Sequence, residues 1–258
     1  MNAFSLGYWK IADRLSRHRR TVHSRGLNFS LQCNNPITYY RWESYNTKEP
    51  ETLDWIDRDV KNGDLVFDIG ANIGAYTIYT LLRHPQSRVV AFEPEYANLH
   101  FLRDNIVENG LQDRATIYPL ALSDRSGPST LHIQDLTPGA ALSSEAVETL
   151  TTTKSGHRVV AREGTYTLTL DEFCRQTAMQ PNSIKIDVDG TEPAILAGAV
   201  STFANAALRS VIIELSETDR DSKDCTSRLE RAGLKLEWKA EGCANQIWRR
   251  PTAGVSQP

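Results

Sequence analysis

Acidic and glycine residues alternate in the stretch DLVFDIGANIG of residues 64–74. Asp68, Gly70, Asn72 and Gly74 follow one another at intervals of two. A glycine turn between a strand and a helix can bind a ligand because its backbone N–H groups are accessible. A pyrophosphate fits this turn poorly, since Asp68 would repel it and Asn72 replaces the glycine that would let it approach. The turn therefore favours a ligand that carries positive charge and no phosphate.

S-adenosylmethionine has these properties, because it combines a cationic amine and a cationic sulfonium with a carboxylate. We expect Asp68 to attract the cations, directly or through water, and the turn amides to bind the carboxylate. Glu93 ends the next expected strand, VVAFE, and a carboxylate there can accept both hydroxyls of a ribose. Helix capping by Asp68 and a solvated Glu93 are the non-functional alternative, but the combined pattern favours S-adenosylmethionine as the cofactor.

Three carboxylates lie close together in the stretch KIDVDGTE, namely Asp187, Asp189 and Glu192. They follow an expected strand, at the edge where open α/β sheets bind ligands. Asp187 and Asp189 point the same way if the strand continues to residue 189, and close carboxylates raise at least one pKa. The cluster could supply a general base, bind Mg²⁺ or hydrogen-bond a polyhydroxylated acceptor, whereas Asp189 and Glu192 could instead cap a helix. We predict a catalytic role for all three and no metal site, since no further ligand is evident.

Four further residues could assist this cluster. Glu214 ends the expected strand SVIIEL at the same edge, and His132 and His157 could supply a base. A histidine in a polar loop is more often only solvated. Lys185 is expected either to extend to solvent or to pair with a neighbouring charge.

Strands and helices alternate along the part of the chain that must position these residues. The alternation, with short β-branched strands, predicts an α/β fold with a mostly parallel, doubly wound sheet and helices on both faces. We expect strands at residues 65–69, 88–93, 115–122, 183–188, 210–215, 235–240 and 245–250, and helices at residues 49–61, 75–84, 95–109, 192–205 and 222–233. A short Gly/Asn turn predicts that the last two strands form an antiparallel hairpin at one edge.

We expect one domain of residues 49–250, preceded by an extension of residues 1–48 and followed by a disordered tail of residues 251–258. The extension is predicted to contain a helix at residues 4–17 and a hairpin formed by GLNFSLQ and PITYYRW. The helix ends in basic residues, so it could pack on the domain or make peripheral contact with an anionic membrane surface. Residues 124–165 are rich in Gly, Ser, Thr and Pro and are expected to form a lid or a disordered loop beside the acceptor.

The composition is that of a soluble globular protein, with 258 residues of which 40% are hydrophobic and 24% are charged. The net charge of −3 gives no support for a nucleic-acid partner. The four cysteines form no C-x-x-C pair, and no apolar run approaches the ~18 residues that a membrane span requires. Since no signal-peptide pattern is evident either, we expect a reduced, cytoplasmic protein.

Several blocks of the sequence resemble the FkbM-type family of S-adenosylmethionine-dependent methyltransferases. The blocks are VFDIGANIGAYT, VVAFEPEYANLHFLRDNIVENG, ALSDRSG, TLDEF, SIKIDVDGTEPAILAGA and VIIEL, and they agree with the family in order and spacing over residues 50–216. The resemblance implies a Rossmann-like class I methyltransferase fold with a seven-stranded sheet. It also implies O-methylation, often of a sugar hydroxyl on an antibiotic, a glycolipid or a surface polysaccharide.

The cofactor-binding positions of the family match residues of this chain. They are Asp68, Gly70, Asn72 and Gly74 in the turn, Glu93 at the ribose and, less closely, Ala121, Leu122 and Ser123 at the adenine. The chain departs from the family in the stretch DVDGTEP, where the family more often has a glutamate at position 189 and no proline at position 193.

We therefore predict an S-adenosylmethionine-dependent O-methyltransferase that acts on a small-molecule or glycan acceptor. In this prediction Asp187 positions the acceptor hydroxyl or acts as its base. Two other classes stay open, namely an NAD-dependent oxidoreductase, which Asp68 and Asn72 disfavour, and a non-catalytic binding module on the same fold. A methyltransferase for protein or nucleic acid is disfavoured, because the sequence lacks an N-P-P-Y-like stretch and a broad basic face.

Overall fold

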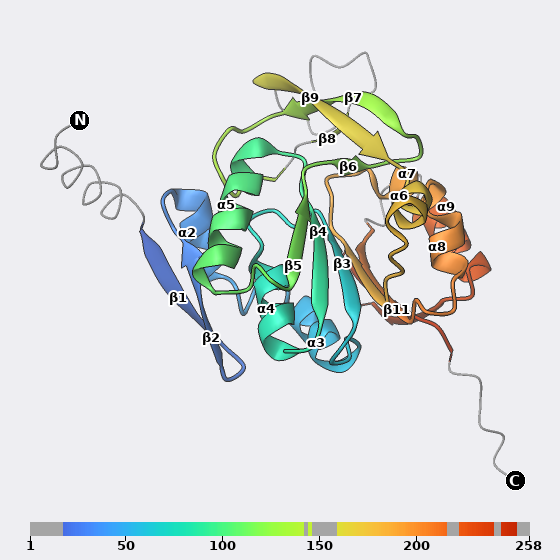
Figure 1. The fold of residues 1–258 in the computed structure, drawn as a ribbon, viewed down its shortest axis with the longest axis horizontal. Coiled ribbons are helices and arrows are strands. Elements are labelled where there is room, and N and C mark those ends of the chain that lie inside the picture. The colour runs from blue at the N-terminus through green and yellow to red at the C-terminus, as the bar shows by residue number, and fades with distance from the viewer. Residues whose placement is uncertain (1–17, 142–143, 146–158, 216–221, 240–243, 252–258) are drawn as a thin grey trace, which may run out of the picture.

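A seven-stranded sheet forms the centre of the computed structural model, which describes residues 18–141, 144–145, 159–215, 222–239 and 244–251 (Figure 1). The strands, in spatial order, are β12 (Lys235–Lys239), β13 (Asn245–Arg249), β11 (Ser210–Glu214), β10 (Ser183–Ile186), β3 (Leu65–Ile69), β4 (Arg88–Phe92) and β5 (Ala115–Tyr118). The five strands from β11 to β5 are parallel, and β12 and β13 run antiparallel at one edge. The predicted sheet with its terminal antiparallel hairpin is therefore confirmed.

Helices cover both faces of this sheet, as predicted. One face carries α3 (Pro50–Arg58), α4 (Ala75–Arg83) and α5 (Tyr96–Glu108), and the other carries α6 (Leu170–Thr177), α7 (Glu192–Ala197), α8 (Val200–Ala204) and α9 (Ser222–Arg231). The side chains of each strand alternate between the two faces. Val66 of β3 packs with Ile78 of α4, whereas the next residue, Phe67, packs with Phe173 of α6. Strands buried on both faces explain the nearly continuous apolar sequence of β3.

A second, smaller sheet lies above the carboxyl ends of the parallel strands (Figure 1). Its order is β6 (Ala121–Leu122), β9 (Ala161–Leu168), β7 (Gly127–Ile133) and β8 (Ser144–Glu145). The expectation of a disordered loop at 124–165 is therefore wrong for β7 and β9, because Gly127–Ile133 pairs antiparallel with Ala161–Thr167. The expectation of a lid beside the acceptor stays a prediction. The two strands were not predicted because their composition is polar. A sheet with one solvated face needs few apolar residues. Residues 146–158 lie outside the described part of the chain.

The N-terminal extension contains a hairpin, in which the predicted strand GLNFSLQ is present as β2 (Leu27–Gln32) but pairs with a different partner. β1 (Arg19–Ser24) pairs with β2 (Leu27–Gln32), while α2 (Pro36–Glu43) replaces the expected second strand. Asn35 starts α2 with a capping box, since its side chain accepts the N–H of Thr38 while the Thr38 side chain accepts the N–H of Asn35. The cap and the following proline outweigh the β-propensity of the tyrosines and threonine. The predicted helix at 4–17 and residues 252–258 of the predicted tail lie outside the described residues.

Three predicted elements differ from the structure in their extent. The expected strand at 115–122 divides at Pro119 into β5 of the main sheet and β6 of the small one. The expected helix at 192–205 divides at Gly198, where a Cβ atom would lie 2.2 Å from the carbonyl oxygen of Ser123. The expected strand at 183–188 ends at Ile186, so Asp187 and Asp189 do not share one strand face as predicted.

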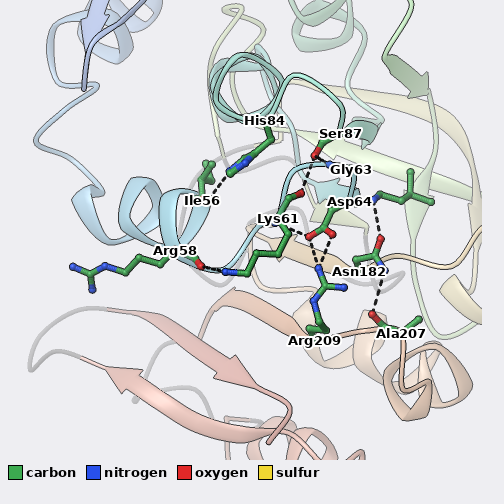
Figure 2. Close-up of polar contacts among 11 residues, drawn as sticks. Ile56, Arg58, Lys61, Gly63, Asp64, His84, Ser87, Asn182, Ala207 and Arg209 are labelled. Atoms are coloured by element: carbon green, nitrogen blue, oxygen red, sulfur yellow. Dashed lines mark hydrogen bonds and ion pairs between the residues drawn. The ribbon is translucent and has the colours of Figure 1, made fainter. Parts of the chain in front are cut away.

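The amino ends of the parallel strands are closed by polar contacts (Figure 2). Nη2 of Arg209 lies 2.6 Å from each carboxylate oxygen of Asp64. Asn182 accepts the N–H of Leu65 at 2.9 Å and donates to the carbonyl oxygen of Ala207 at 3.3 Å. These contacts join the entries of β3, β10 and β11, which leaves the carboxyl ends of the same strands for a binding site.

Candidate active site

A cavity of about 250 Å³ lies at the carboxyl ends of the parallel strands. Its wall contains five residues that were predicted to bind the cofactor, namely Gly70, Asn72, Glu93, Ala121 and Leu122. Asp187 and Asp189 of the acidic cluster also line it, together with Glu214. The structure therefore brings most of the predicted site residues together around one space. Asp68, Gly74, Ser123 and Glu192 lie outside its wall.

The glycines of the turn between β3 and α4 permit close backbone contacts. Gly70 and Gly74 have left-handed φ values of 80° and 83°. A Cβ atom on Gly70 would lie 2.0 Å from the carbonyl oxygen of Asp187, and one on Gly74 would lie 2.4 Å from Cδ1 of Leu102. Gly70 thus brings the turn against the end of β10, and Gly74 lets α4 begin against α5.

The N–H groups of this turn all donate within the protein. The five N–H groups from Gly70 to Gly74 reach the carbonyl oxygens of Phe92 and Ala71 and the side chains of Asn72 and Glu93, at 2.8–3.0 Å. The turn therefore leaves no free N–H group for a carboxylate, contrary to our expectation from the sequence. A carboxylate in this cavity needs another partner.

Asn72 connects the turn to a loop that covers the cavity. Its φ is 50°, a left-handed value that asparagine tolerates better than most residues. Its Nδ2 donates to the carbonyl oxygen of Ala140 at 2.9 Å, and Nδ2 of Asn98 donates to the same oxygen at 3.1 Å. Asn98 also accepts the N–H of Gly139 at 2.7 Å. Two asparagines from the main domain therefore hold the loop that follows β7.

Glu93 lies in the cavity wall and is almost fully buried. Its two carboxylate oxygens accept the N–H groups of Asn72 at 2.8 Å and of Glu95 at 3.0 Å. Burial raises the pKa of Glu93 to about 7, although these two hydrogen bonds oppose the shift. Each oxygen keeps a further lone pair, so the carboxylate can still accept two hydroxyl groups.

Asp68 lies behind the turn, with only 4% of its surface exposed. It is on the strand face that packs on α4, where it accepts the hydroxyl of Thr77 at 2.5 Å. Its Oδ1 has no hydrogen-bond partner among the described residues. Burial raises the pKa of Asp68, while Lys185 and Thr77 oppose the shift. The predicted contact of Asp68 with a cofactor therefore stays a prediction.

Lys185 and Glu214 both favour the ionised form of Asp187. Nζ of Lys185 lies 2.7 Å from Oδ2 of Asp187, so the predicted pairing with a neighbour is confirmed. Burial favours the neutral form of Asp187, but the Lys185 ammonium and the hydrogen bond with Glu214 together outweigh it, so the pKa of Asp187 is lowered. Partial desolvation and a hydrogen bond to Asp187 raise the pKa of Glu214. The two carboxylates therefore share one proton, with Asp187 as the ionised partner.

Glu192 is buried at the start of α7 and lies just outside the cavity. Burial, aided by the nearby carboxylates of Asp187 and Asp189, raises its pKa to about 7. One of its oxygens accepts the N–H of Gly190 at 3.4 Å. The alternative of a cap formed by Asp189 is wrong, since Thr191 is the N-cap residue and makes no side-chain cap bond.

Two other candidates, Ser123 and His132, do not reach the cavity wall in the described structure, and a third lies outside the described residues. Ser123 is buried, and its N–H donates to the carbonyl oxygen of Leu168 at 3.0 Å, which extends the small sheet. His132 is 8% exposed on β7, and burial lowers its pKa. His157 lies outside the described residues.

The structure adds residues that the sequence reasoning missed. Arg41 and Lys48 line the cavity from the segment before the main domain, and Asn98 lines it from α5. Arg41 was missed because residues 36–42 were expected to be a strand of a hairpin ahead of the main domain, and Lys48 gave no signal of its own in the sequence. Asn98 gave no signal, since a single asparagine in an amphipathic helix has no diagnostic spacing.

Neither a metal site nor a membrane span is found among the described residues. No group of three or more His, Cys, Asp or Glu side chains there is arranged to hold a metal ion. No helix in the same part of the chain is long and apolar enough to cross a membrane.

The fold is similar to that of a solved methyltransferase. The methyltransferase FkbM from Methylobacillus flagellatus superposes with a TM-score of 0.50 and 15% sequence identity, over 83% of this chain and 53% of that protein. The chain thus spans about half the length of that protein. The fold class of the chain is therefore the Rossmann-like methyltransferase fold.

Sequence comparison gives the family. Residues 68–236 match the family model of the methyltransferase FkbM domain. The 31-O-demethyl-FK506 methyltransferase FkbM of Streptomyces tacrolimicus is 28% identical over 221 residues, which cover 76% of this chain and 84% of that protein. The hexuronic acid methyltransferase AglP of Haloferax volcanii is 28% identical over 195 residues, which cover 73% of this chain and 71% of that protein. The chain is a methyltransferase and belongs to the FkbM methyltransferase family.

Proposed function

We propose that the chain transfers a methyl group from S-adenosylmethionine to a hydroxyl group of a sugar or of a glycan-containing metabolite. The observation that carries the proposal is one cavity at the carboxyl edge of the sheet, lined by Asn72 of the glycine turn, by Glu93 and by Asp187. The family assignment favours this function over an NAD-dependent oxidoreductase.

The cavity wall suits the parts of this donor. S-adenosylmethionine supplies an electrophilic methyl group on a positively charged sulfur. Glu93 can accept the two ribose hydroxyls, because each of its oxygens has a free lone pair beside its N–H bond. Ala121 and Leu122 line the cavity with Leu120 and Ile195, which gives an apolar surface for an adenine ring.

The acidic side of the cavity suits the transfer step. Asp187 stays ionised beside Lys185, so it can accept a hydrogen bond from the acceptor hydroxyl and aim the oxygen at the methyl carbon. As the oxygen–carbon bond forms and the carbon–sulfur bond breaks, the hydroxyl proton passes to Asp187, which is the ionised member of the carboxylate pair. Glu214 has a raised pKa and already holds the proton that the pair shares, so it donates a hydrogen bond to Asp187 and accepts no second proton. Asp189 adds a further carboxylate to this wall, and Glu192 lies just outside it.

A sugar acceptor is supported by the relatives rather than by one contact. The name of AglP states that it methylates a hexuronic acid. The name of the Streptomyces tacrolimicus relative places its methyl group on an oxygen. Both are consistent with a hydroxyl as the group that receives the methyl in this chain.

The first test is calorimetric titration of S-adenosylmethionine into the full chain, with NADH as a competing ligand. We expect saturable binding without competition, and a loss of about tenfold or more in Glu93→Gln, because an amide offers the ribose hydroxyls one acceptor oxygen where a carboxylate offers two. Glu230→Gln, at an exposed position on α9, is the matched control. Absent binding, displacement by NADH, or equal affinity in both variants contradicts the proposal. Release of S-adenosylhomocysteine in the presence of a sugar panel then tests the transfer.

A further inference from the structure

Two cations lie where the cofactor cavity meets a second cavity. Arg41 and Lys48 are the basic side chains that the described structure places in the wall of the cofactor cavity. Both also line a neighbouring cavity of about 420 Å³, together with Tyr40 and Asp135. The donor and the acceptor must meet at such a junction if the proposed function is correct.

Arg41 is held in place while most of its donors stay available. Its Nε donates to the carbonyl oxygen of Gly139 at 2.5 Å. Nδ2 of Asn35, at the start of the same helix, donates to the carbonyl oxygen of Pro138 at 3.0 Å. Two bonds thus attach α2 to the loop over the cavity. The terminal guanidinium nitrogens of Arg41 have no partner in the described part of the chain, so a fork of donors is presented in a fixed orientation.

Lys48 lies close enough to the acidic wall to lower the pKa of Asp187. Its side chain is 43% exposed and forms an ion pair with Glu49. An ammonium has three donors, so this pair leaves two for a ligand. Lys48 therefore adds a second positive charge at the same junction.

The charges that face the second cavity favour an anion. Arg41 and Lys48 are opposed there by Asp135 alone among the described lining residues. Asp135 accepts the N–H of Thr137 at 2.8 Å, and the hydrogen bonds from Thr137 lower its pKa. Tyr40, which is 53% exposed, adds an aromatic surface on which a sugar ring can pack.

The glycine turn leaves this site as the place for a carboxylate. All N–H groups from Gly70 to Gly74 are bonded within the protein. The remaining charged groups of the cofactor cavity are carboxylates, which repel a ligand carboxylate. We propose that Arg41 and Lys48 form a carboxylate-binding site at the junction of the two cavities. This inference rests on the proposed function and names the charge that its ligand carries.

Two ligands of a methyltransferase can supply this carboxylate. One is the amino-acid part of the donor, and the other is an acidic acceptor such as a uronic acid. The guanidinium fork fits either one, because both present the same planar group. The experiment therefore needs one arm for each source.

The donor arm compares S-adenosylhomocysteine with 5′-methylthioadenosine, which lacks the carboxylate and the amine of the amino-acid part. Both are titrated calorimetrically into the full chain and into Arg41→Gln and Lys48→Gln. If the site binds the donor, each variant weakens S-adenosylhomocysteine about tenfold and leaves 5′-methylthioadenosine unchanged.

The acceptor arm compares the binding of D-glucuronate and D-galacturonate with that of D-glucose and D-galactose, measured by saturation-transfer NMR. The unaltered chain is loaded with S-adenosylhomocysteine, and the variants are loaded with 5′-methylthioadenosine. If the site binds the acceptor, the unaltered chain prefers an acid over its neutral counterpart about tenfold, and both variants lose the preference. Arg41→Lys keeps the charge, so we expect it to retain part of the affinity for S-adenosylhomocysteine or part of the preference for the acidic sugar. Arg88→Gln, at an exposed position at the amino end of β4, is the control and is expected to retain both in full.

The two arms decide the inference together. A charge-dependent loss in either arm supports it and names the source of the carboxylate. Unchanged affinities in both arms overturn it, as does an equal loss for S-adenosylhomocysteine and 5′-methylthioadenosine, which would show that the cations only shape the cavity. If the unaltered chain binds neither adenosine compound, the proposed function fails. The acceptor arm is then carried out without an adenosine compound, and its result still decides whether Arg41 and Lys48 bind a carboxylate.

Discussion

Lys185 and Asp187 form an ion pair of 2.7 Å that joins the centre of the main sheet to the wall of the cavity. The side chain of Lys185 is 5% exposed and that of Asp187 is 30% exposed. Burial alone would lower the pKa of Lys185, but the carboxylates of Asp187 and Asp68 more than offset it, so the pKa is raised. One ammonium therefore stabilises both the carboxylate behind the cofactor turn and the carboxylate proposed for catalysis.

Replacement of this lysine is expected to destabilise the chain. Lys185→Met leaves Asp187 and Asp68 without their shared cation, and breaking a buried pair from one side costs about 3 kcal/mol of unfolding free energy. Urea unfolding followed by circular dichroism measures the loss. Lys223→Met, at an exposed position on α9, serves as the control and is expected to change the stability by less than about 0.5 kcal/mol. Equal effects of the two substitutions would contradict this account of the ion pair.

The free energy of unfolding is expected to depend on pH because of Glu192. Its pKa is raised from 4.5 to about 7 in the folded chain, so the native state holds a proton that the unfolded state has lost between these values. The stability that Glu192 contributes is therefore complete below pH 4.5 and is lost as the pH rises through about 7.

The variant Glu192→Gln removes this titration. We expect the variant to gain about 3 kcal/mol relative to the unaltered chain between pH 4.5 and pH 8. Unfolding by urea at a series of pH values measures the difference, with Glu230→Gln as the exposed control. A stability difference that does not change with pH would show that the carboxyl of Glu192 titrates normally.

Gly70 is expected to tolerate no side chain, because the obstacle is the backbone of β10. Gly70→Ala places an alanine at a left-handed φ of 80°, and its Cβ atom would lie 2.0 Å from the carbonyl oxygen of Asp187. Gly26→Ala has nearly the same φ, 82°, but meets no atom within 4 Å. We expect a loss of about 1 kcal/mol for Gly26→Ala and about 3 kcal/mol or more for Gly70→Ala, measured by urea unfolding. Similar losses in both variants would mean that only the φ value matters.

Asn72 is expected to control the mobility of the loop over the cavity. Asn72→Gly preserves the left-handed backbone but removes the hydrogen bond to the carbonyl oxygen of Ala140. We expect the amide N–H of Gly139 and its neighbours to exchange with deuterium about tenfold faster, measured by hydrogen exchange with mass spectrometry. Asn28→Gly, in the N-terminal hairpin, is the control. Unchanged exchange at 139–141 would show that Asn98 holds the loop alone.

The main sheet could be predicted because its strands are short apolar runs separated by amphipathic helices. The small sheet could not, because β7 and β9 carry polar residues on a solvated face and resemble a loop. α2 was missed because three aromatic residues in PITYYRW favour a strand locally, whereas the cap formed by Asn35 and Pro36 decides the conformation.

The candidate site was predictable where its residues follow a strand, as Glu93 and Asp187 do. The position of Asp68 behind the turn was not predicted. Side chains alternate along β3, so the Asp68 side chain faces α4, where it accepts the hydroxyl of Thr77. Arg41 could not be predicted either, since α2 brings it to the cavity by packing on the loop at 138–139, and Lys48 lies in the segment between α2 and α3. Contacts between distant segments leave no periodic signal in a single sequence.

The helix α2 lies outside residues 68–236, the part of the chain that matches the family model. The strands and the glycine turn that carry the proposed transfer chemistry begin after it, and α2 is joined to the loop over the cavity by the hydrogen bonds of Asn35 and Arg41. Tyr45, which follows α2, is buried against Tyr76 and Tyr79 of α4, so this part of the chain is anchored in the core of the main domain. Arg41 and Lys48 nevertheless lie outside the parallel strands, so a substitution at either one changes the charge in the cavity wall and leaves the sequence of those strands unaltered.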